Sequence, residues 1–353
     1  MNLTLHLTDN CNLDCSYCIR EKCPKDMTAE VLFRACDLAF SKGTRAGLCF
    51  FGGEPLLKKD LIYKALDYCE EKSQKTGMPF ECKMTTNGTL LDEEFLERAK
   101  SLKMGIGLSF DGKAQDICRV FANGKATSHV VEEKAKLLLS YMPDSVALAT
   151  IAPQAVPYYA ESVRYLHDLG FNKVSFVIAY GKKVNWTDSD LDLLRTQLEL
   201  TVEYLKDLFI QKDSFYMSAI GSKIRDCIRG KNPAERCHLG VRQMPVTPSG
   251  DLYPCTSFIG DEHYLLGNVF DGINDAKVME LAKKTSVPIT CAGCDLIKRC
   301  TNSCGCANRM NTGDENLVSP LQCTYERMLI EISDKLGEEL YQIDPERFTI
   351  QFA

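Results

Sequence analysis

The stretch Cys11-Asn-Leu-Asp-Cys15-Ser-Tyr17-Cys18 places three cysteines at C-x3-C-x2-C spacing, shortly after the apolar run 3–7. Thiolates at this spacing on a loop can ligate three corners of a four-iron, four-sulfur cluster and leave the fourth iron without a protein ligand. Half of a zinc site is the alternative, but a structural zinc site needs four ligands and only Cys23 follows closely. The spacing therefore favours an iron–sulfur cluster with one open iron.

Length and charge limit the possible classes of protein. The chain has 353 residues, of which 45% are hydrophobic, and its formal net charge is −6. Because this length exceeds that of a usual single domain, we expect two domains or one large barrel with an appended unit. Lysine and arginine are scattered without basic runs, which argues against nucleic acid or an anionic membrane surface as a partner.

The chain contains 18 cysteines, many of them at short intervals. The first residues, 1–6, lack the basic and apolar segments of a signal peptide, and no apolar run is long enough to cross a membrane. We therefore expect a cytoplasmic protein, and in a reducing cytosol clustered cysteines indicate metal ligation. Because an open iron–sulfur cluster is destroyed by oxygen, we further expect an anaerobic host.

Strand-like and helix-like segments alternate over the first two thirds of the chain. Short apolar runs that predict buried strands lie at 3–7, 47–51, 80–84, 105–110, 146–151 and 174–179. Amphipathic segments of helical period lie at 28–41, 59–75, 92–102, 128–140, 156–169 and 188–210. Six such units in series predict an α/β fold with a parallel sheet, either a barrel or a doubly wound sheet.

Polar turns follow three of these strands. Gly52-Gly53-Glu54-Pro55 follows the second, where glycines permit close approach to a ligand and a carboxylate can accept hydrogen bonds from an ammonium group. Thr85-Thr86-Asn87-Gly88 follows the third and predicts either a cofactor contact or an ordinary helix-capping turn. Ser109-Phe110-Asp111-Gly112 follows the fourth. In a barrel all three turns would meet at the same face.

The cysteine loop, with Tyr17 directly before the third cysteine, and the turns that follow it resemble the radical S-adenosylmethionine superfamily. The resemblance implies a partial (β/α)6 TIM-like barrel. In this family S-adenosylmethionine chelates the open iron held by Cys11, Cys15 and Cys18, and one electron from a donor such as flavodoxin or ferredoxin cleaves it to a 5'-deoxyadenosyl radical. Cofactor binding is implied for Tyr17, Gly52, Gly53, Glu54, Pro55, Thr86, Asn87, Ser109 and Arg119.

Arg119 is the least direct of these assignments. Ser109 and Asp111-Gly112 match the Ser-x-Asp-Gly sequence of the peptide- and protein-modifying relatives, which have an arginine twelve residues after the serine. Position 121 is Phe here, so Arg119 matches only if two residues are deleted from the turn. A guanidinium that binds the cofactor carboxylate is the functional interpretation, and a surface arginine in a loop is the alternative.

A second cysteine system follows the strand–helix alternation. Its spacing, including a Gly-Asp-Leu-Tyr-Pro-Cys255 hairpin, matches the SPASM domain of the same superfamily. The resemblance implies two auxiliary four-iron clusters, hence three clusters in all, one auxiliary cluster held by Cys291, Cys294, Cys300 and Cys323 and the other by Cys237, Cys255 and Cys304. We expect the barrel over residues 1–215, the SPASM domain over 216–330 and a C-terminal tail over 331–353.

Two positions depart from the sulfatase-maturing relatives. Gln243 stands where these have a fourth cysteine, which leaves an iron open to a substrate thiolate unless the nearby Cys306 ligates it. Thr256 stands where they have an aspartate base, and a threonine cannot accept that proton at neutral pH.

We therefore expect an enzyme that modifies a ribosomally made, cysteine-containing peptide or protein by forming a thioether or another side-chain cross-link. Oxidation of cysteine or serine to formylglycine, as in anaerobic sulfatase maturation, is one alternative. A non-enzymatic electron carrier or scaffold is another, although a carrier needs no cofactor pocket. Because the chain has only ten residues before Cys11, we expect a leader peptide to be recognised by another surface or by a separate protein.

Overall fold

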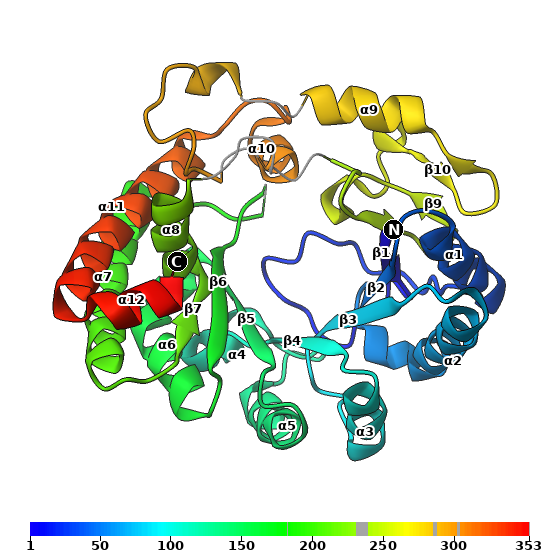
Figure 1. Ribbon diagram of the computed structural model, residues 1–353, viewed down its shortest axis with the longest axis horizontal. Coiled ribbons are helices and arrows are strands. Elements are labelled where there is room, and N and C mark those ends of the chain that lie inside the picture. The colour runs from blue at the N-terminus through cyan, green and yellow to red at the C-terminus, as the bar shows by residue number, and fades with distance from the viewer. Residues whose placement is uncertain (182, 231–238, 285–287, 302–303, 353) are drawn as a thin grey trace.

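The computed structural model describes residues 1–181, 183–230, 239–284, 288–301 and 304–352, and its central strands curve into an incomplete barrel (Figure 1). Six parallel strands follow one another in the sheet in the order of the sequence. They are β1 (Asn2–His6), β2 (Ala46–Phe51), β3 (Phe80–Thr86), β4 (Gly105–Ser109), β5 (Val146–Ile151) and β6 (Lys173–Ile178). The predicted α/β fold with a six-unit parallel barrel is confirmed.

Helices cover the outer side of these strands (Figure 1). Side chains fix several of their first turns: Thr28 accepts a hydrogen bond from the backbone at the start of α1, and Thr187 forms a reciprocal capping box with Asp190 in α7. The barrel helices are α1 (Ala29–Ser41), α2 (Lys59–Thr76), α3 (Glu93–Ser101), α4 (Gln115–Cys118), α5 (Ser128–Tyr141), α6 (Tyr159–Asp168) and α7 (Asp188–Ile210).

The two faces of the strands differ in burial because successive side chains point to opposite sides. In β2, Leu48 and Phe50 are buried in the hydrophobic core, whereas Phe51 lines a cavity inside the barrel. Ser109 at the end of β4 and Thr150 in β5 line the same cavity. The inner face of the barrel is therefore free to hold a site near the carboxyl ends of the strands.

Five short strands extend the sheet beyond these six. On one side β7 (Tyr216–Met217) pairs with β6, and on the other side β8 (Met244–Val246) pairs with β1 in parallel. Antiparallel pairing then adds β9 (Asp251–Leu252), β10 (Gly267–Asn268) and β11 (Gly272–Ile273). The cysteine-rich region thus continues the barrel sheet, and the expected hairpin before Cys255 is formed by β8 and β9.

The remaining helices are α8 (Ser218–Arg229), α9 (Asp275–Lys284), α10 (Gly305–Thr312), α11 (Pro320–Ile343) and α12 (Pro345–Phe352). Helix α11 packs against α7 and α8, and residue 331, where the tail was expected to begin, lies within it. The division of the chain into three segments stays a prediction. Among the described helices, none is both long and apolar enough to cross a membrane.

Candidate active site

The loop that carries Cys11, Cys15 and Cys18 follows β1 and is held by backbone hydrogen bonds. The amide of Asp14 donates to the Val120 carbonyl at 2.7 Å, and the amide of Ser16 donates to the Cys118 carbonyl at 2.9 Å. All three cysteines border one cavity of about 430 Å³ inside the barrel. Burial raises the pKa of the Cys15 thiol to about 11, so binding of a metal cluster there must displace protons.

The same cavity gathers nearly all of the predicted cofactor residues. Those that line it are Tyr17, Gly52, Gly53, Glu54, Thr86, Asn87, Ser109 and Arg119. Pro55 is the exception, since it is buried at the first position of a short 3-10 helix, Pro55–Lys58. The cavity is thus surrounded by thiols, amides, hydroxyls, a carboxylate and a guanidinium. These groups suit an iron–sulfur cluster together with a zwitterionic cofactor such as S-adenosylmethionine.

The two glycines of the Gly-Gly-Glu-Pro turn are required by the chain itself. A Cβ atom on Gly52, whose φ is +132°, would lie 2.4 Å from the Thr8 carbonyl oxygen, and one on Gly53 would lie 2.0 Å from the Asn10 carbonyl oxygen. The amides of Gly53 and Glu54 donate to these same carbonyls at 2.8 and 2.9 Å. The glycines therefore allow close approach to the cysteine loop, where the sequence had suggested approach to a ligand.

Glu54 joins this turn to the one after β3. Its side chain is 1% exposed and accepts hydrogen bonds from the Thr86 hydroxyl at 2.6 Å, the Asn87 amide at 2.7 Å and the Leu56 amide at 3.0 Å. Burial raises the pKa of Glu54 to about 7, although the three donors favour the carboxylate.

Asn87 forms a local turn and contacts the cysteine loop. Its carboxamide oxygen accepts from the Thr89 amide at 3.0 Å, and its nitrogen donates to Asn12 at 2.8 Å in the cysteine loop. The next helix, α3, is capped by Asp92 instead, and contact of Asn87 with a cofactor stays a prediction.

Arg119 is 8% exposed and lines the cavity, so it is not a surface arginine. Its Nε donates to Asp111 at 2.8 Å, and its guanidinium carbon lies 5.3 Å from the centre of the Tyr17 ring. The Tyr17 hydroxyl donates to the same Asp111 oxygen at 2.6 Å, and the Thr150 amide donates to the other oxygen at 2.8 Å. Asp111 thus orients both Tyr17 and Arg119, a role that its place in the Ser-x-Asp-Gly turn did not reveal.

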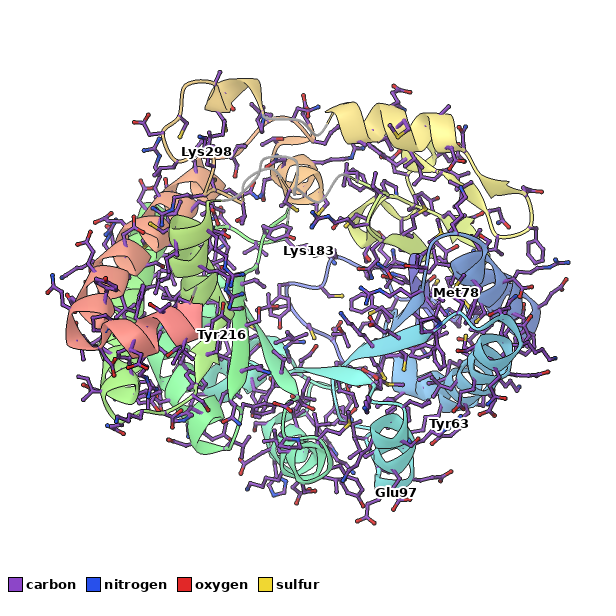
Figure 2. All side chains as sticks on the ribbon, in the orientation of Figure 1. Tyr63, Met78, Glu97, Lys183, Tyr216 and Lys298 are labelled. Atoms are coloured by element: carbon purple, nitrogen blue, oxygen red, sulfur yellow. The ribbon has the colours of Figure 1, made fainter. Side chains whose placement is uncertain are left out.

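The loop that follows β6 contacts the cysteine loop. Lys183, labelled near the middle of the molecule in Figure 2, donates from Nζ to the Cys18 carbonyl at 3.2 Å. A second cavity of about 340 Å³ adjoins the first through Tyr17, Cys18, Ile19 and Tyr180.

Cys291, Cys294, Cys300 and Cys323 line one small cavity, as the predicted auxiliary cluster requires. The Arg327 guanidinium lies 3.9 Å from the Cys294 sulfur. Four thiols around a single space fit a fully ligated four-iron cluster.

At the other predicted auxiliary site lies Cys306, which the sequence had left as an alternative ligand. Cys304 and Cys306 have their sulfur atoms 3.0 Å apart, and hydrogen bonding from the Cys306 thiol lowers the pKa of both Cys255 and Cys304. Cys237 lies outside the described residues. Gln243, at the position of the absent cysteine, donates to the Thr4 hydroxyl in β1.

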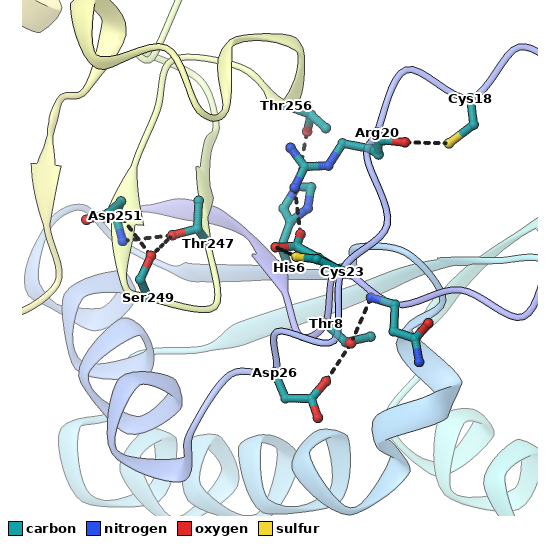
Figure 3. A network of polar contacts seen from close by, with 12 residues as sticks. His6, Thr8, Cys18, Arg20, Cys23, Asp26, Thr247, Ser249, Asp251 and Thr256 are labelled. Carbon is teal, nitrogen blue, oxygen red and sulfur yellow. Dashed lines mark hydrogen bonds and ion pairs between the residues drawn. The ribbon is translucent and has the colours of Figure 1, made fainter.

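Thr256 lines the main cavity directly after Cys255. Its hydroxyl lies 3.3 Å from Nε2 of His6, the last residue of β1, and Figure 3 shows this contact beside Arg20. His6 is fully buried, its Nδ1 has no hydrogen-bond partner within the described structure, and burial lowers its pKa to about 3. No sequence pattern distinguished this histidine from the others.

Comparisons with known proteins identify relatives of this chain. Residues 5–155 match the model of the radical SAM superfamily. An uncharacterised protein of Methanocaldococcus jannaschii is 33% identical over 294 residues, which are 81% of this chain and 93% of that protein.

Two relatives with assigned roles are more distant. The cysteine-type anaerobic sulfatase-maturating enzyme of Clostridium perfringens is 23% identical and covers 84% of this chain and 86% of that enzyme. The antilisterial bacteriocin subtilosin biosynthesis protein AlbA of Bacillus subtilis is 24% identical and covers 76% of this chain and 57% of AlbA.

Solved structures share the fold. A sulfatase-maturase structure, anSMEcpe with bound S-adenosylmethionine and a Cp18Cys peptide, has a TM-score of 0.82 at 21% identity and covers 97% of this chain and 99% of that one. Streptococcus suis SuiB bound to its precursor peptide SuiA has a TM-score of 0.64 at 18% identity and covers 91% and 75%. With three cysteines and several polar turns around one cavity, this chain is an enzyme that belongs to the radical S-adenosylmethionine superfamily.

Proposed function

We propose that this enzyme cross-links a ribosomally made, cysteine-containing peptide or protein through a thioether or another side-chain bond. The observation that carries the proposal is the reach of the main cavity, which extends from Cys11, Cys15 and Cys18 to Thr256, the neighbour of Cys255. A peptide side chain in this cavity would lie between the radical source and the auxiliary cysteines.

When bound, the cluster and S-adenosylmethionine supply a 5'-deoxyadenosyl radical that removes a hydrogen atom from a substrate carbon. Joining this carbon to a cysteine sulfur of the same peptide releases one proton from the thiol and one electron. An auxiliary iron–sulfur cluster is the proposed electron acceptor. The product is therefore two hydrogens lighter than the substrate for each cross-link.

The residues of the chain would position the cofactor for this reaction. Asp111 engages Nε of Arg119, which leaves the two terminal guanidinium nitrogens for the cofactor carboxylate. Glu54 is buried at the cavity wall, where it accepts hydrogen bonds from the Thr86 hydroxyl and the Asn87 amide. Each carboxylate oxygen can accept a further hydrogen bond, which suits an ammonium group.

Thr256 is an argument against formylglycine formation. That reaction needs a base beside the substrate, and a threonine hydroxyl does not accept a proton at neutral pH. The Thr256 hydroxyl contacts His6, and because burial lowers the pKa of His6 to about 3, this histidine is a poor proton acceptor as well. The similarity to sulfatase-maturating enzymes over 84% of the chain nevertheless keeps this oxidation as the second candidate.

The test is anaerobic reconstitution with S-adenosylmethionine, a reductant and candidate cysteine-containing peptides, followed by mass spectrometry. Cross-linking predicts a product lighter by two hydrogens whose cysteine resists thiol alkylation. A product that reacts with a carbonyl reagent would support formylglycine formation instead. Formation of 5'-deoxyadenosine in the same assay separates both from a non-enzymatic electron carrier.

We further propose that the protein works in the cytoplasm and takes its electron from a flavodoxin or ferredoxin. The test is to replace the chemical reductant with each of these donors and to measure 5'-deoxyadenosine.

A further inference from the structure

We propose that Arg327 raises the reduction potential of one predicted auxiliary cluster by placing its guanidinium against the cysteine ligands. All four ligands expected for this cluster lie within the described residues, and they line one small cavity together with Arg327. They are Cys291, Cys294, Cys300 and Cys323. Hydrogen bonds to the ligand sulfurs and the charge around a cluster are among the factors that set its potential.

Helix α11 places Arg327 beside two of these sulfur atoms. Cys323 and Arg327 are four residues apart in α11, so their side chains lie on the same face of the helix, one turn from each other. The guanidinium of Arg327 contacts the Cys323 sulfur, and its Nη2 lies 3.9 Å from the Cys294 sulfur. One cationic side chain thus joins a ligand on the helix to a ligand on the preceding loop.

A second charged side chain at the cavity, Glu326, is balanced by a buried lysine. Its Oε2 accepts from Nζ of Lys223 at 2.7 Å, and both residues are buried. Lys223 comes from α8, which packs beside α11 (Figure 1). Because Lys223 and Glu326 neutralise each other, the exposed Arg327 supplies the remaining positive charge of the three.

The same carboxylate has a structural task. It accepts hydrogen bonds from the amide and the hydroxyl of Thr301 at 2.7 and 2.6 Å. Thr301 directly follows Cys300, so Glu326 fixes the backbone next to a ligand. Positioning of the ligands and tuning of the cluster are therefore assigned to different residues, Glu326 and Arg327.

The direction of the effect follows from charge. A four-iron cluster becomes more negative by one charge on reduction, and a cation that touches the ligand sulfurs stabilises the more negative form. Removing this cation should therefore lower the potential. Given the proposed function, on which this step rests, a raised potential would let this cluster hold the surplus electron of cross-linking, whichever auxiliary cluster receives it first.

The test uses the whole chain with Cys11, Cys15 and Cys18 replaced by alanine, so that only auxiliary clusters contribute to the spectrum. After anaerobic reconstitution, electron paramagnetic resonance is recorded during a redox titration, and the signal lost in Cys294→Ala is assigned to the cluster beside Arg327. Adding Arg327→Gln should lower the midpoint potential of this signal. A tenfold change in the ratio of reduced to oxidised cluster corresponds to about 59 mV.

Lys335→Gln is the matched control. Lys335 is an exposed cation on the same helix, eight residues or about 12 Å further along its axis. Its substitution removes the same charge, which solvent ions largely screen at that distance, and should leave the potential nearly unchanged. An Arg327→Gln potential that shifts no more than that of Lys335→Gln would overturn the proposal, as would a spectrum with no signal that depends on Cys294.

Arg327→Lys keeps the charge but loses the planar guanidinium that reaches two sulfurs. Its potential should fall between those of the parent and of Arg327→Gln. If Arg327→Gln does not retain the cluster, Arg327→Lys decides the question: a potential below that of the parent supports the proposal, and an unchanged potential refutes it.

The titration needs no peptide, so its outcome is separate from that of the proposed function. A lowered potential in Arg327→Gln, together with a wild type that yields no cross-linked product, would refute the function and leave the role of Arg327. Cross-linking by the wild type, together with an unshifted potential in Arg327→Gln, would do the reverse.

Discussion

The Glu54 carboxylate accepts a hydrogen bond from the Thr86 hydroxyl at 2.6 Å, so one buried acceptor joins the turns that follow β2 and β3. Both turns border the cavity of the cysteine loop. A change at Glu54 should therefore affect the cofactor pocket as a whole.

Glu54→Gln should weaken binding of S-adenosylmethionine. The substitution removes the charge that would attract the cofactor ammonium and turns one acceptor into a donor that faces other donors. Hydrogen bonds to charged groups contribute about 1.5–3 kcal/mol, so the dissociation constant should increase roughly 10- to 150-fold. Equilibrium binding of S-adenosylmethionine to the reconstituted enzyme measures this constant. Glu81→Gln, at an exposed glutamate of β3, is the control and should bind normally.

Cofactor affinity should depend on pH through the same residue. Because burial raises the pKa of Glu54 to about 7, the carboxylate becomes neutral as the pH falls below this value. The wild type should therefore bind S-adenosylmethionine more weakly at pH 6 than at pH 8. An identical pH dependence in Glu54→Gln would show that another group titrates.

The free energy of unfolding should decrease as the pH rises, whereas cofactor affinity should increase. The folded pKa of Glu54 is raised from 4.5 to about 7, so the folded state binds the proton more tightly than the unfolded state. This contribution is fully present below pH 4.5 and is lost as the pH rises toward 7 and above. Denaturant unfolding of the apoprotein between pH 5 and 8 should show a wild-type decrease on the order of 3 kcal/mol that Glu54→Gln lacks.

Asp111→Asn should destabilise the fold, because it leaves the buried Arg119 guanidinium without a carboxylate. Breaking a buried ion pair from one side costs about 3–5 kcal/mol. Urea unfolding measures the loss. Glu81→Ala, which breaks an exposed pair with Arg45, should cost less than about 1 kcal/mol, and equal losses in the two variants would contradict the role of Asp111.

Three four-iron clusters predict about twelve irons per chain after anaerobic reconstitution. Replacing Cys11, Cys15 and Cys18 with alanine should remove one third of them. Iron and acid-labile sulfide assays measure both values. A wild type that saturates near four irons, or that carries zinc in the cysteine-rich region, would exclude the auxiliary clusters.

Cys255→Ala should separate radical formation from product formation. The loop of Cys11, Cys15 and Cys18 is intact in this variant, so 5'-deoxyadenosine should still form, whereas the cross-link should not because the proposed electron acceptor is lost. Chromatography and mass spectrometry measure the two products. A cross-linked peptide from this variant would show that the cluster is dispensable.

Local patterns predicted the parallel strands, whereas the family resemblance was needed to choose a barrel over a doubly wound sheet and to name the cofactor residues. Apolar runs gave the six parallel strands, and residues such as Ser109 and Thr86 lie at strand ends, where a parallel barrel must bring them together. Of the outer strands, only the hairpin of β8 and β9 was expected, from the resemblance. The pairing of β8 with β1 and of β7 with β6 could not be predicted, because strands of two or three residues carry no periodic signal and their partners lie far along the chain.

Contacts between residues far apart in the chain could not be predicted from the sequence either. The pairing of Asp111 with Tyr17 spans 94 residues, and that of His6 with Thr256 spans 250. The convergence of Cys306 with Cys304 depends on where α10 begins, and the sequence does not mark this start with a polar capping residue.

The parallel pairing of β1 with β8 places Leu3 opposite Met244. One of these strands leads into the loop of Cys11, and the other leads into the hairpin before Cys255. Rates of electron tunnelling fall steeply with distance, and here the spacing between the two cysteine groups is set by backbone hydrogen bonds within one sheet. Electron flow between clusters at these places would therefore need no closure of one domain upon another.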